Sequence, residues 1–383
     1  MKYIPIYLLL LFFMPMGVFS QVKFETIQSS KLEEKREIKI QLPEDYENNI
    51  DKTYPLFIVL DGDYMFDTVA GNVKYYSYWD DMPEAIVVGV SQLNSRYDDS
   101  VYSEQNSLPI DTGADFFEFI GLELVPYIEN KYRANKFRVI VGHGETANFI
   151  NYYLLKPKPL FQSYIAISPE LAPNMIDFLP STLEVLKSKI FYYLANTNND
   201  SGSIKKMSQV LNKDIVAIEN PNLDYRFDAF EGPSHYAVPT HAIPNALEKM
   251  FKVYEPISKK EYKEIILELE ISPVLYLQEK YQNIEDVFGI SKKIRINDYR
   301  AISSAIEKNE TYEYYEELSK MARKDYPDTL LGEFYMARFY EETGEPKRAM
   351  KTYQAAYSLD EIAGVTVDDM QDRAALIKED FGY

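Results

Sequence analysis

The chain has 383 residues, which is more than one typical domain needs and enough to bury a large core. Its formal net charge of −19 argues against binding to nucleic acid, because contact with the phosphate backbone is driven by clustered lysines and arginines. The sequence contains no cysteine, which excludes a disulfide framework, thiol catalysis and a cysteine-ligated metal site.

The first residues have the pattern of a secretory signal peptide. Lys2 gives a basic start, the run from Ile6 to Phe13 is almost entirely apolar, and cleavage is expected after Ser20. The apolar run is shorter than the ~20 residues of a membrane-spanning helix and is soon followed by Pro15. Residues 1–20 therefore predict an exported chain, periplasmic or extracellular, with no membrane span after cleavage. An uncleaved anchor is the alternative.

From residue 22 to residue 254 the pattern alternates between strands and helices. The segment 36–42 alternates like an edge strand, and continuous apolar runs follow at 54–60, 85–90, 138–141, 163–167 and 189–195. Helical stretches such as 115–130 separate these runs. Short apolar strands divided by helices are typical of a parallel sheet covered on both faces, so this region predicts an α/β fold.

The composition becomes helical after the Pro-containing segment 254–256, and residues 257–383 are predicted to form a small all-α domain. The pattern of a tetratricopeptide repeat fits one helix pair at Ala337, Tyr340, Gly344, Ala349, Tyr353, Ala356 and Leu359. Ala322 precedes Ala356 by one repeat period. Such arrays bind peptides or proteins, so we expect a protein partner here. A helical extension that only supports the α/β domain is the alternative.

A set of short motifs in the α/β region is similar in order and spacing to one protein family. The motifs are 42–46, 55–63, Asn94 with Arg96, 124–128, 132–133, 142–143, 165–169 and 235–239. The chain resembles the putative esterase family of α/β-hydrolases, which includes esterase D and the enterochelin esterases. This resemblance implies an α/β-hydrolase fold over residues 22–254, in which a histidine activates a serine to attack an ester carbonyl.

The resemblance places the nucleophile at Gly144. Active relatives have Gly-His-Ser where this chain has Gly142-His143-Gly144, between a strand and a helix. Glycine has no side chain that could attack, and Thr146 is expected to project elsewhere. We therefore expect a catalytically inactive protein that binds a small molecule in the inherited cleft or holds a protein partner. The alternative is an active carboxylic-ester hydrolase of the siderophore type, which would use Ser168 or a water activated by His235.

The resemblance also implies the other members of a vestigial triad. His235 matches the catalytic histidine, and Asp200, which follows the strand 189–195, is the candidate for the acid that orients it. Asn196, Asn198 and Asn199 are the alternatives in the same loop, which is also compatible with a plain turn.

An oxyanion hole is implied at the N–H group that follows position 144 and at a second N–H group near Tyr64. Glu145 would oppose negative charge there if its side chain pointed to the hole, whereas solvent is its other possible direction. His143 is expected to line the same cleft. The spacing of the three histidines matches no metal-ligand pattern, so neither a metal nor another cofactor is expected.

Overall fold

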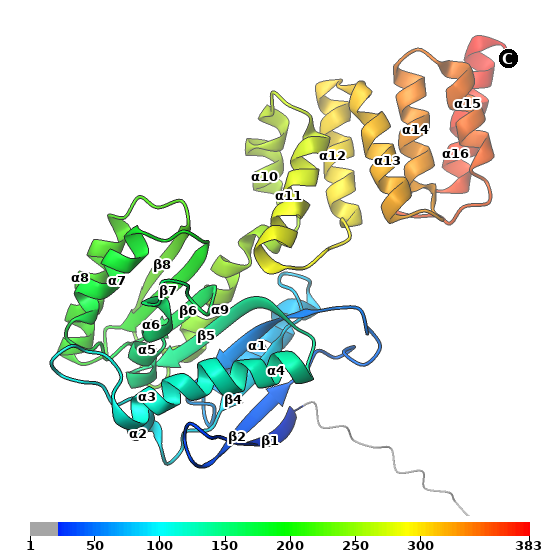
Figure 1. The fold of residues 1–383 in the computed structure, drawn as a ribbon. Helices are drawn as coiled ribbons and strands as arrows, with labels where there is room; N and C mark the ends of the chain where they lie inside the picture. The colour runs from blue at the N-terminus through cyan, green and yellow to red at the C-terminus, as the bar shows by residue number, and fades with distance from the viewer. Residues whose placement is uncertain (1–21) are drawn as a thin grey trace, which may run out of the picture.

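The computed structural model describes residues 22–383 and has two connected parts (Figure 1). An α/β part comes first, and a row of helices projects from one end of it. The predicted signal peptide, residues 1–20, lies outside the described residues. Within the described part of the chain, no helix has the length and apolar character needed to cross a membrane.

The described residues form one eight-stranded sheet in the order β1-β2-β4-β3-β5-β6-β7-β8. The pairs β1–β2 and β2–β4 are antiparallel. The six strands β3 to β8 run parallel to one another. The strands are β1 (Val22–Gln28), β2 (Lys35–Gln41), β3 (Tyr54–Val59), β4 (Ile86–Val90), β5 (Ala134–His143), β6 (Ser163–Ile167), β7 (Ile190–Thr197) and β8 (Leu223–Phe230).

The α/β prediction is confirmed, and its differences from the structure lie at the sheet edges. The strands β1 and β8 were not predicted, because most of their residues are exposed or only partly buried and give no apolar run. The segment 36–42 forms β2, but the prediction that it is an edge strand is wrong, since β1 pairs with its outer side.

Helices cover both faces of the sheet (Figure 1). Alternate side chains of β3 point to opposite faces, so Phe57 packs in the core with α1 and α9, whereas Leu56 packs in the core with α3 to α8. The helices of this part are α1 (Phe66–Tyr78), α2 (Arg96–Asp99), α3 (Asp111–Glu118), the π-helical η1 (Phe119–Leu124), α4 (Val125–Lys131), α5 (Glu145–Phe149), α6 (Asn151–Leu154), α7 (Met175–Glu184), α8 (Gly202–Val216), α9 (Pro239–Met250) and the 3₁₀ turn η2 (Lys252–Tyr254).

The C-terminal part is helical, as predicted. Gly344 lies in the turn between α14 and α15 with φ +84°, the place that the repeat pattern gave it. The assignment of these helices to tetratricopeptide repeats stays a prediction. The elements are α10 (Lys259–Glu264), η3 (Ile266–Glu268), α11 (Pro273–Phe288), α12 (Ile296–Asn309), η4 (Tyr312–Tyr314), α13 (Tyr315–Asp325), α14 (Leu330–Glu342), α15 (Pro346–Ala355) and α16 (Val367–Phe381).

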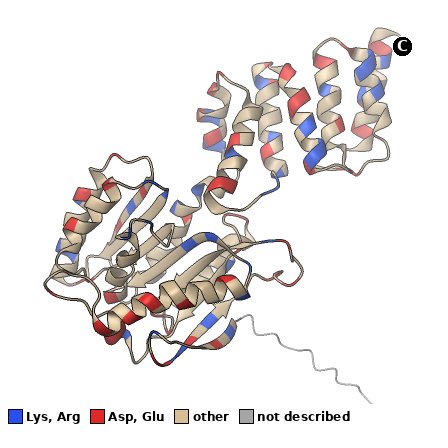
Figure 2. Ribbon diagram, in the orientation of Figure 1, with Lys and Arg blue, Asp and Glu red and all other residues tan. Residues whose placement is uncertain are grey.

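Acidic and basic residues alternate along the helical part (Figure 2). The buried Arg338 on α14 pairs with Glu307 on α12 at 2.6 Å and with Glu341 on its own helix at 2.9 Å. Arg373 on α16 also reaches Glu341, at 3.2 Å. This network connects α12, α14 and α16.

The two parts share one hydrophobic core. The ring of Phe288, at the end of α11, lies 5.0 Å from the rings of both Phe137 and Phe251. The side-chain amide of Asn135 donates to the carbonyl of Phe288 at 2.9 Å. Asn135 lies near the beginning of β5, so the helical part is attached at the end of this strand that is opposite to His143.

Ion pairs support the same junction. Asp80, just after α1, contacts Lys292 at 2.5 Å and Arg295 at 2.6 Å. Arg295 also donates to the carbonyl oxygen of Tyr254 at 2.7 Å. At residues 254–257 the chain changes from strands and helices to helices alone. The hydrophobic core continues across this predicted boundary.

Replacing Phe288 by alanine is expected to lower the free energy of unfolding by about 3–5 kcal/mol, because a large buried ring leaves a cavity between the two parts. Urea denaturation of the mature chain measures this loss. Phe381→Ala on α16 is the matched control, since that ring is 58% exposed, and a change within about 0.5 kcal/mol is expected there. Equal losses in the two variants would contradict the shared core.

Candidate functional site

The segment around residue 144 has the geometry of a nucleophile elbow. The strand β5 ends at His143, α5 begins at Glu145, and Gly144 between them has φ +63° and ψ −119°. A side chain at Gly142 would place its Cβ 2.5 Å from the carbonyl oxygen of Thr146, so only glycine permits this close approach of helix to strand. The sequence-based expectation of a strand, a sharp turn and a helix agrees with this arrangement.

His235 and Asp200 lie together beside this turn. The Nδ1 atom of His235 is 2.6 Å from Oδ1 of Asp200, a residue that is 5% exposed. The other oxygen of Asp200 accepts from the hydroxyl of Ser168 at 2.7 Å and from the N–H of Thr197 at 2.9 Å. Burial alone would raise the pKa of Asp200, but the hydrogen bonds from these three neighbours hold the pKa below its ordinary value.

Asn198 and Asn199, in the same loop as Asp200, bond the backbone of a neighbouring loop instead of His235. Asn198 accepts from the backbone N–H of Gly232 at 3.1 Å, and Asn199 donates to the carbonyl oxygens of Gly232 and Pro233. These bonds hold the loop that carries His235. The structure therefore brings Asp200, rather than Asn198 or Asn199, to the imidazole.

The missing side chain at Gly144 would face His235. A Cβ atom built on Gly144 lies 3.7 Å from Nε2 of His235, 3.5 Å from Oε1 of Glu170 and 3.2 Å from Nη2 of Arg96. A serine hydroxyl, one bond further out, would reach the imidazole. Position 144 therefore has the relation to the histidine that a nucleophile requires, but glycine supplies no nucleophile.

Arg96 occupies the space in front of the elbow. Its guanidinium bonds Asp61 at 2.6 Å, Glu145 at 2.7 Å and the carbonyl oxygen of His143 at 2.8 Å. Sequence reasoning used Arg96 only as part of the family resemblance and assigned it no role at the site. Its partners lie 35 to 49 positions away, so only the fold reveals the contact.

Glu145 points toward the site, one of the two directions left open by the sequence. Its half-buried carboxylate forms the ion pair with Arg96 and faces a cavity. Burial raises the pKa of Glu145; Arg96 opposes this shift, and the charges of Glu170 and Asp61 add to it. A negative charge here would oppose an oxyanion at the neighbouring N–H group.

His143 and Tyr64 form a support beneath His235. The buried ring of His143 donates from Nε2 to the carbonyl oxygen of His235 at 3.0 Å, because a carbonyl can only accept. Its Nδ1 then accepts from the hydroxyl of Tyr64 at 2.9 Å. The N–H group of Tyr64 itself donates to the carbonyl oxygen of Asp61 at 3.1 Å. An oxyanion donor near Tyr64 stays a prediction.

The other candidate nucleophiles are engaged in structural hydrogen bonds. The buried hydroxyl of Thr146 donates to Asp61 at 2.6 Å and accepts from the N–H of His143 at 2.9 Å. The buried hydroxyl of Ser168 donates to Asp200. Neither hydroxyl is bonded to His235.

A cavity of about 230 Å³ adjoins the elbow. It is lined by Tyr97, Ser100, Val101, Tyr102, Glu104, Glu145, Asn148 and Glu170. Within residues 22–383, no group of three His, Asp or Glu side chains is arranged to hold a metal ion.

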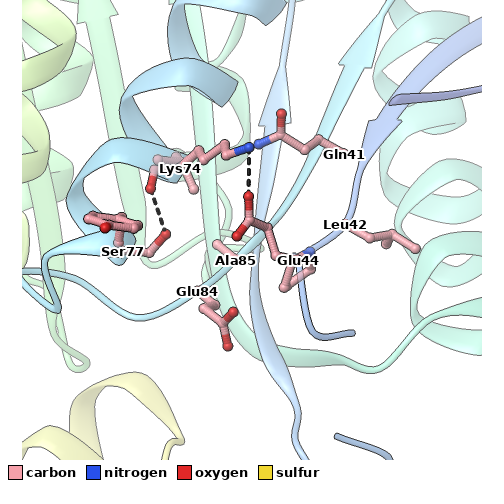
Figure 3. Close-up of a pocket in the computed structure, with 10 residues that line it drawn as sticks. Gln41, Leu42, Glu44, Lys74, Ser77, Glu84 and Ala85 are labelled. Carbon is pink, nitrogen blue, oxygen red and sulfur yellow. Dashed lines mark hydrogen bonds and ion pairs between the residues drawn. The ribbon is translucent and has the colours of Figure 1, made fainter. Parts of the chain in front are cut away.

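A smaller hollow of about 120 Å³ lies at the opposite end of the sheet, between α1 and the end of β2 (Figure 3). The ion pair of Lys74 with Glu44, at 2.7 Å, crosses it, and Ser77 donates to the carbonyl oxygen of Lys74. This hollow is separate from the elbow.

The comparisons with known proteins agree with this geometry. A family model described as putative esterase matches residues 29–260. The chain belongs to the putative esterase family. An uncharacterised protein from Capnocytophaga ochracea is similar to this family member at 31% identity and a TM-score of 0.86, over 94% of this chain and 100% of that one. That coverage includes the helical part.

More distant solved structures share the fold of this putative esterase family member. An IroE-like serine hydrolase from Shewanella oneidensis has a TM-score of 0.57 at 22% identity, over 78% of this chain and 98% of that one. BES protein from Bacillus cereus has a TM-score of 0.53 at 21% identity, over 61% of this chain and 97% of that one. The comparison with curated proteins gives no match.

Gly144→Ala is expected to lower the free energy of unfolding of this esterase-family chain by about 1–3 kcal/mol, because alanine is strained at φ +63°. The new methyl group also crowds Arg96, which hydrogen bonds to Asp61, Glu145 and His143 hold in place. Gly71→Ala is the control: Gly71 lies in α1 with open space around it, and a gain of about 0.4–1 kcal/mol is expected. A stabilising Gly144→Ala substitution would refute the strained turn.

Stability is expected to fall as the pH drops from about 6.5 to about 4. Burial, with a smaller contribution from His235, lowers the pKa of His143 from 6.5 to about 4, so the unfolded chain takes up a proton in this range before the folded chain does. Full protonation of this one group costs about 3 kcal/mol. Urea denaturation at several pH values measures the slope, which His143→Gln should reduce. An unchanged slope in that variant would show that His143 is not the group responsible.

Proposed function

We propose that this esterase-family chain binds a ligand in the cleft at its elbow and hydrolyses no simple ester. The observation that carries the proposal is Gly144 itself, which keeps the φ of a nucleophile elbow and faces His235 but has no attacking atom. Arg96 and Glu145 support it, because their ion pair lies directly beside the turn. The fold then retains a shaped cleft without the chemistry of its relatives.

A second candidate function is ester hydrolysis by a water that His235 activates. It is favoured by the contact of His235 with Asp200, which leaves Nε2 directed at the position of the missing side chain. In this mechanism Nε2 accepts a proton from water as the oxygen attacks the carbonyl carbon, and the protonated ring then gives a proton to the leaving alkoxide. The substrate class would be a carboxylic ester, and a siderophore ester is the specific alternative.

We further propose that residues 1–20 direct the chain out of the cytoplasm and that the helical part holds a protein partner. The hydrophobic run of the first residues supports the first proposal. The row of helical pairs supports the second, since it lies at the end of the sheet away from the elbow and leaves much of its surface uncovered.

The decisive assay compares the purified mature chain with Gly144→Ser and His235→Ala on short-chain p-nitrophenyl esters and a ferric-siderophore ester. The wild type is expected to show no turnover above the buffer rate. Gly144→Ser is expected to restore little activity, because Arg96 and Glu145 still face the elbow.

Robust hydrolysis by the wild type that disappears in His235→Ala would overturn the binding proposal. It would establish the histidine-activated water instead. High activity in Gly144→Ser alone would show that Arg96 and Glu145 do not obstruct the elbow.

A further inference from the structure

We propose that the cavity beside the elbow binds an alkylammonium group, either of a free amine or of a lysine side chain in a peptide. This inference rests on the proposed function, since it names the class of ligand for the same cleft. The charge, the hydrogen-bonding groups and the shape of the cavity support it.

Three carboxylates from separate segments face this cavity. Glu104 follows α2, Glu145 begins α5 and Glu170 follows β6. All three act on the hydroxyl of Tyr102, whose pKa is raised first by burial and then by the negative charges of these groups. Their convergence from three elements gives the cavity a concentrated negative potential.

The nearby cation does not neutralise this charge. Arg96 is paired with both Asp61 and Glu145, so one positive charge is shared by two carboxylates. Within residues 22–383, neither Glu104 nor Glu170 has a basic side chain within 4 Å. A ligand with a positive charge would therefore supply the missing counter-charge.

The hydrogen-bonding groups also favour a donor. Ser100 lines the cavity and is 8% exposed, and its hydroxyl, which can accept as well as donate, has no hydrogen-bond partner among the described residues. When Nδ1–H of His235 donates to Asp200, its Nε2 is an acceptor that faces the adjoining space at Gly144. An ammonium group has three N–H donors and no acceptor, which matches a site rich in acceptors.

The shape of the cavity fits a slender cationic chain. Tyr97 and Tyr102 are among its walls, and aromatic rings attract ammonium groups through their faces. Its volume of about 230 Å³ suits one side chain. A second cavity of about 210 Å³ shares Tyr102 and Glu170 with it, so a longer molecule has room to continue toward α8.

The test is an NMR titration of the mature chain at low salt with n-butylammonium, butyrate and 1-butanol. Only the ammonium ion is expected to bind, and its affinity should fall as salt is added. A capped Gly-Lys-Gly peptide, compared with its norleucine analogue, distinguishes a peptide lysine from a free amine as the source. Equal binding of butanol or butyrate would overturn the proposal.

Two variants locate the bound group. Glu104→Gln and Glu170→Gln each remove one charge from an exposed side chain and should weaken ammonium binding about tenfold. Glu184→Gln, an exposed substitution on α7 outside the cavity, is the matched control and should leave the affinity unchanged. Unchanged affinity in both cavity variants would overturn the site.

The readouts separate this inference from the proposed function. Ester turnover by the wild type would remove the non-hydrolytic function, whereas ammonium binding that depends on Glu104 and Glu170 would still hold and would then define a cationic substrate. Absence of both turnover and ammonium binding would leave the non-hydrolytic function standing and remove this inference alone.

Discussion

The turn between β5 and α5 is the constraint on which the site depends. A sharp reversal with φ +63° is needed for the strand to enter the helix, and any residue at position 144 must adopt it. A residue with a side chain would be strained in this conformation and would persist there only if the surrounding structure enforced it. Glycine adopts this conformation freely, so Gly144 forms the turn without backbone strain.

The persistence of His235 and Asp200 has a physical reason that does not require catalysis. Asp200 is buried and bonds Ser168 and the backbone of its own loop, and the imidazole Nδ1 of His235 bonds its other carboxylate oxygen. Removing one member would leave buried polar groups without partners, which costs more than a typical hydrogen bond contributes. A retained dyad in this family is thus compatible with binding as well as with turnover.

The helical part and the elbow lie at opposite ends of β5. The helical part joins the sheet through Phe288 and the ion pairs of Asp80, at the end of β5 away from the elbow. The proposed ligand of the acidic cavity and the proposed partner of the helices would therefore use different surfaces. Because the core is continuous across the junction, the helices are held firmly relative to the sheet rather than through a flexible linker.

The α/β class, the helical region after it and the glycine at the elbow follow from the amino-acid sequence alone. Buried parallel strands must be apolar throughout and so leave runs that are visible without a structure, and the turn has a local motif. The edge strands β1 and β8 left no such run, since most of their residues stay exposed or half-buried. Only the tertiary structure decided that Arg96 fills the elbow and that Glu104 and Glu170 face one cavity. Those contacts join residues far apart in the chain, and their distances depend on how the loops at the strand ends converge.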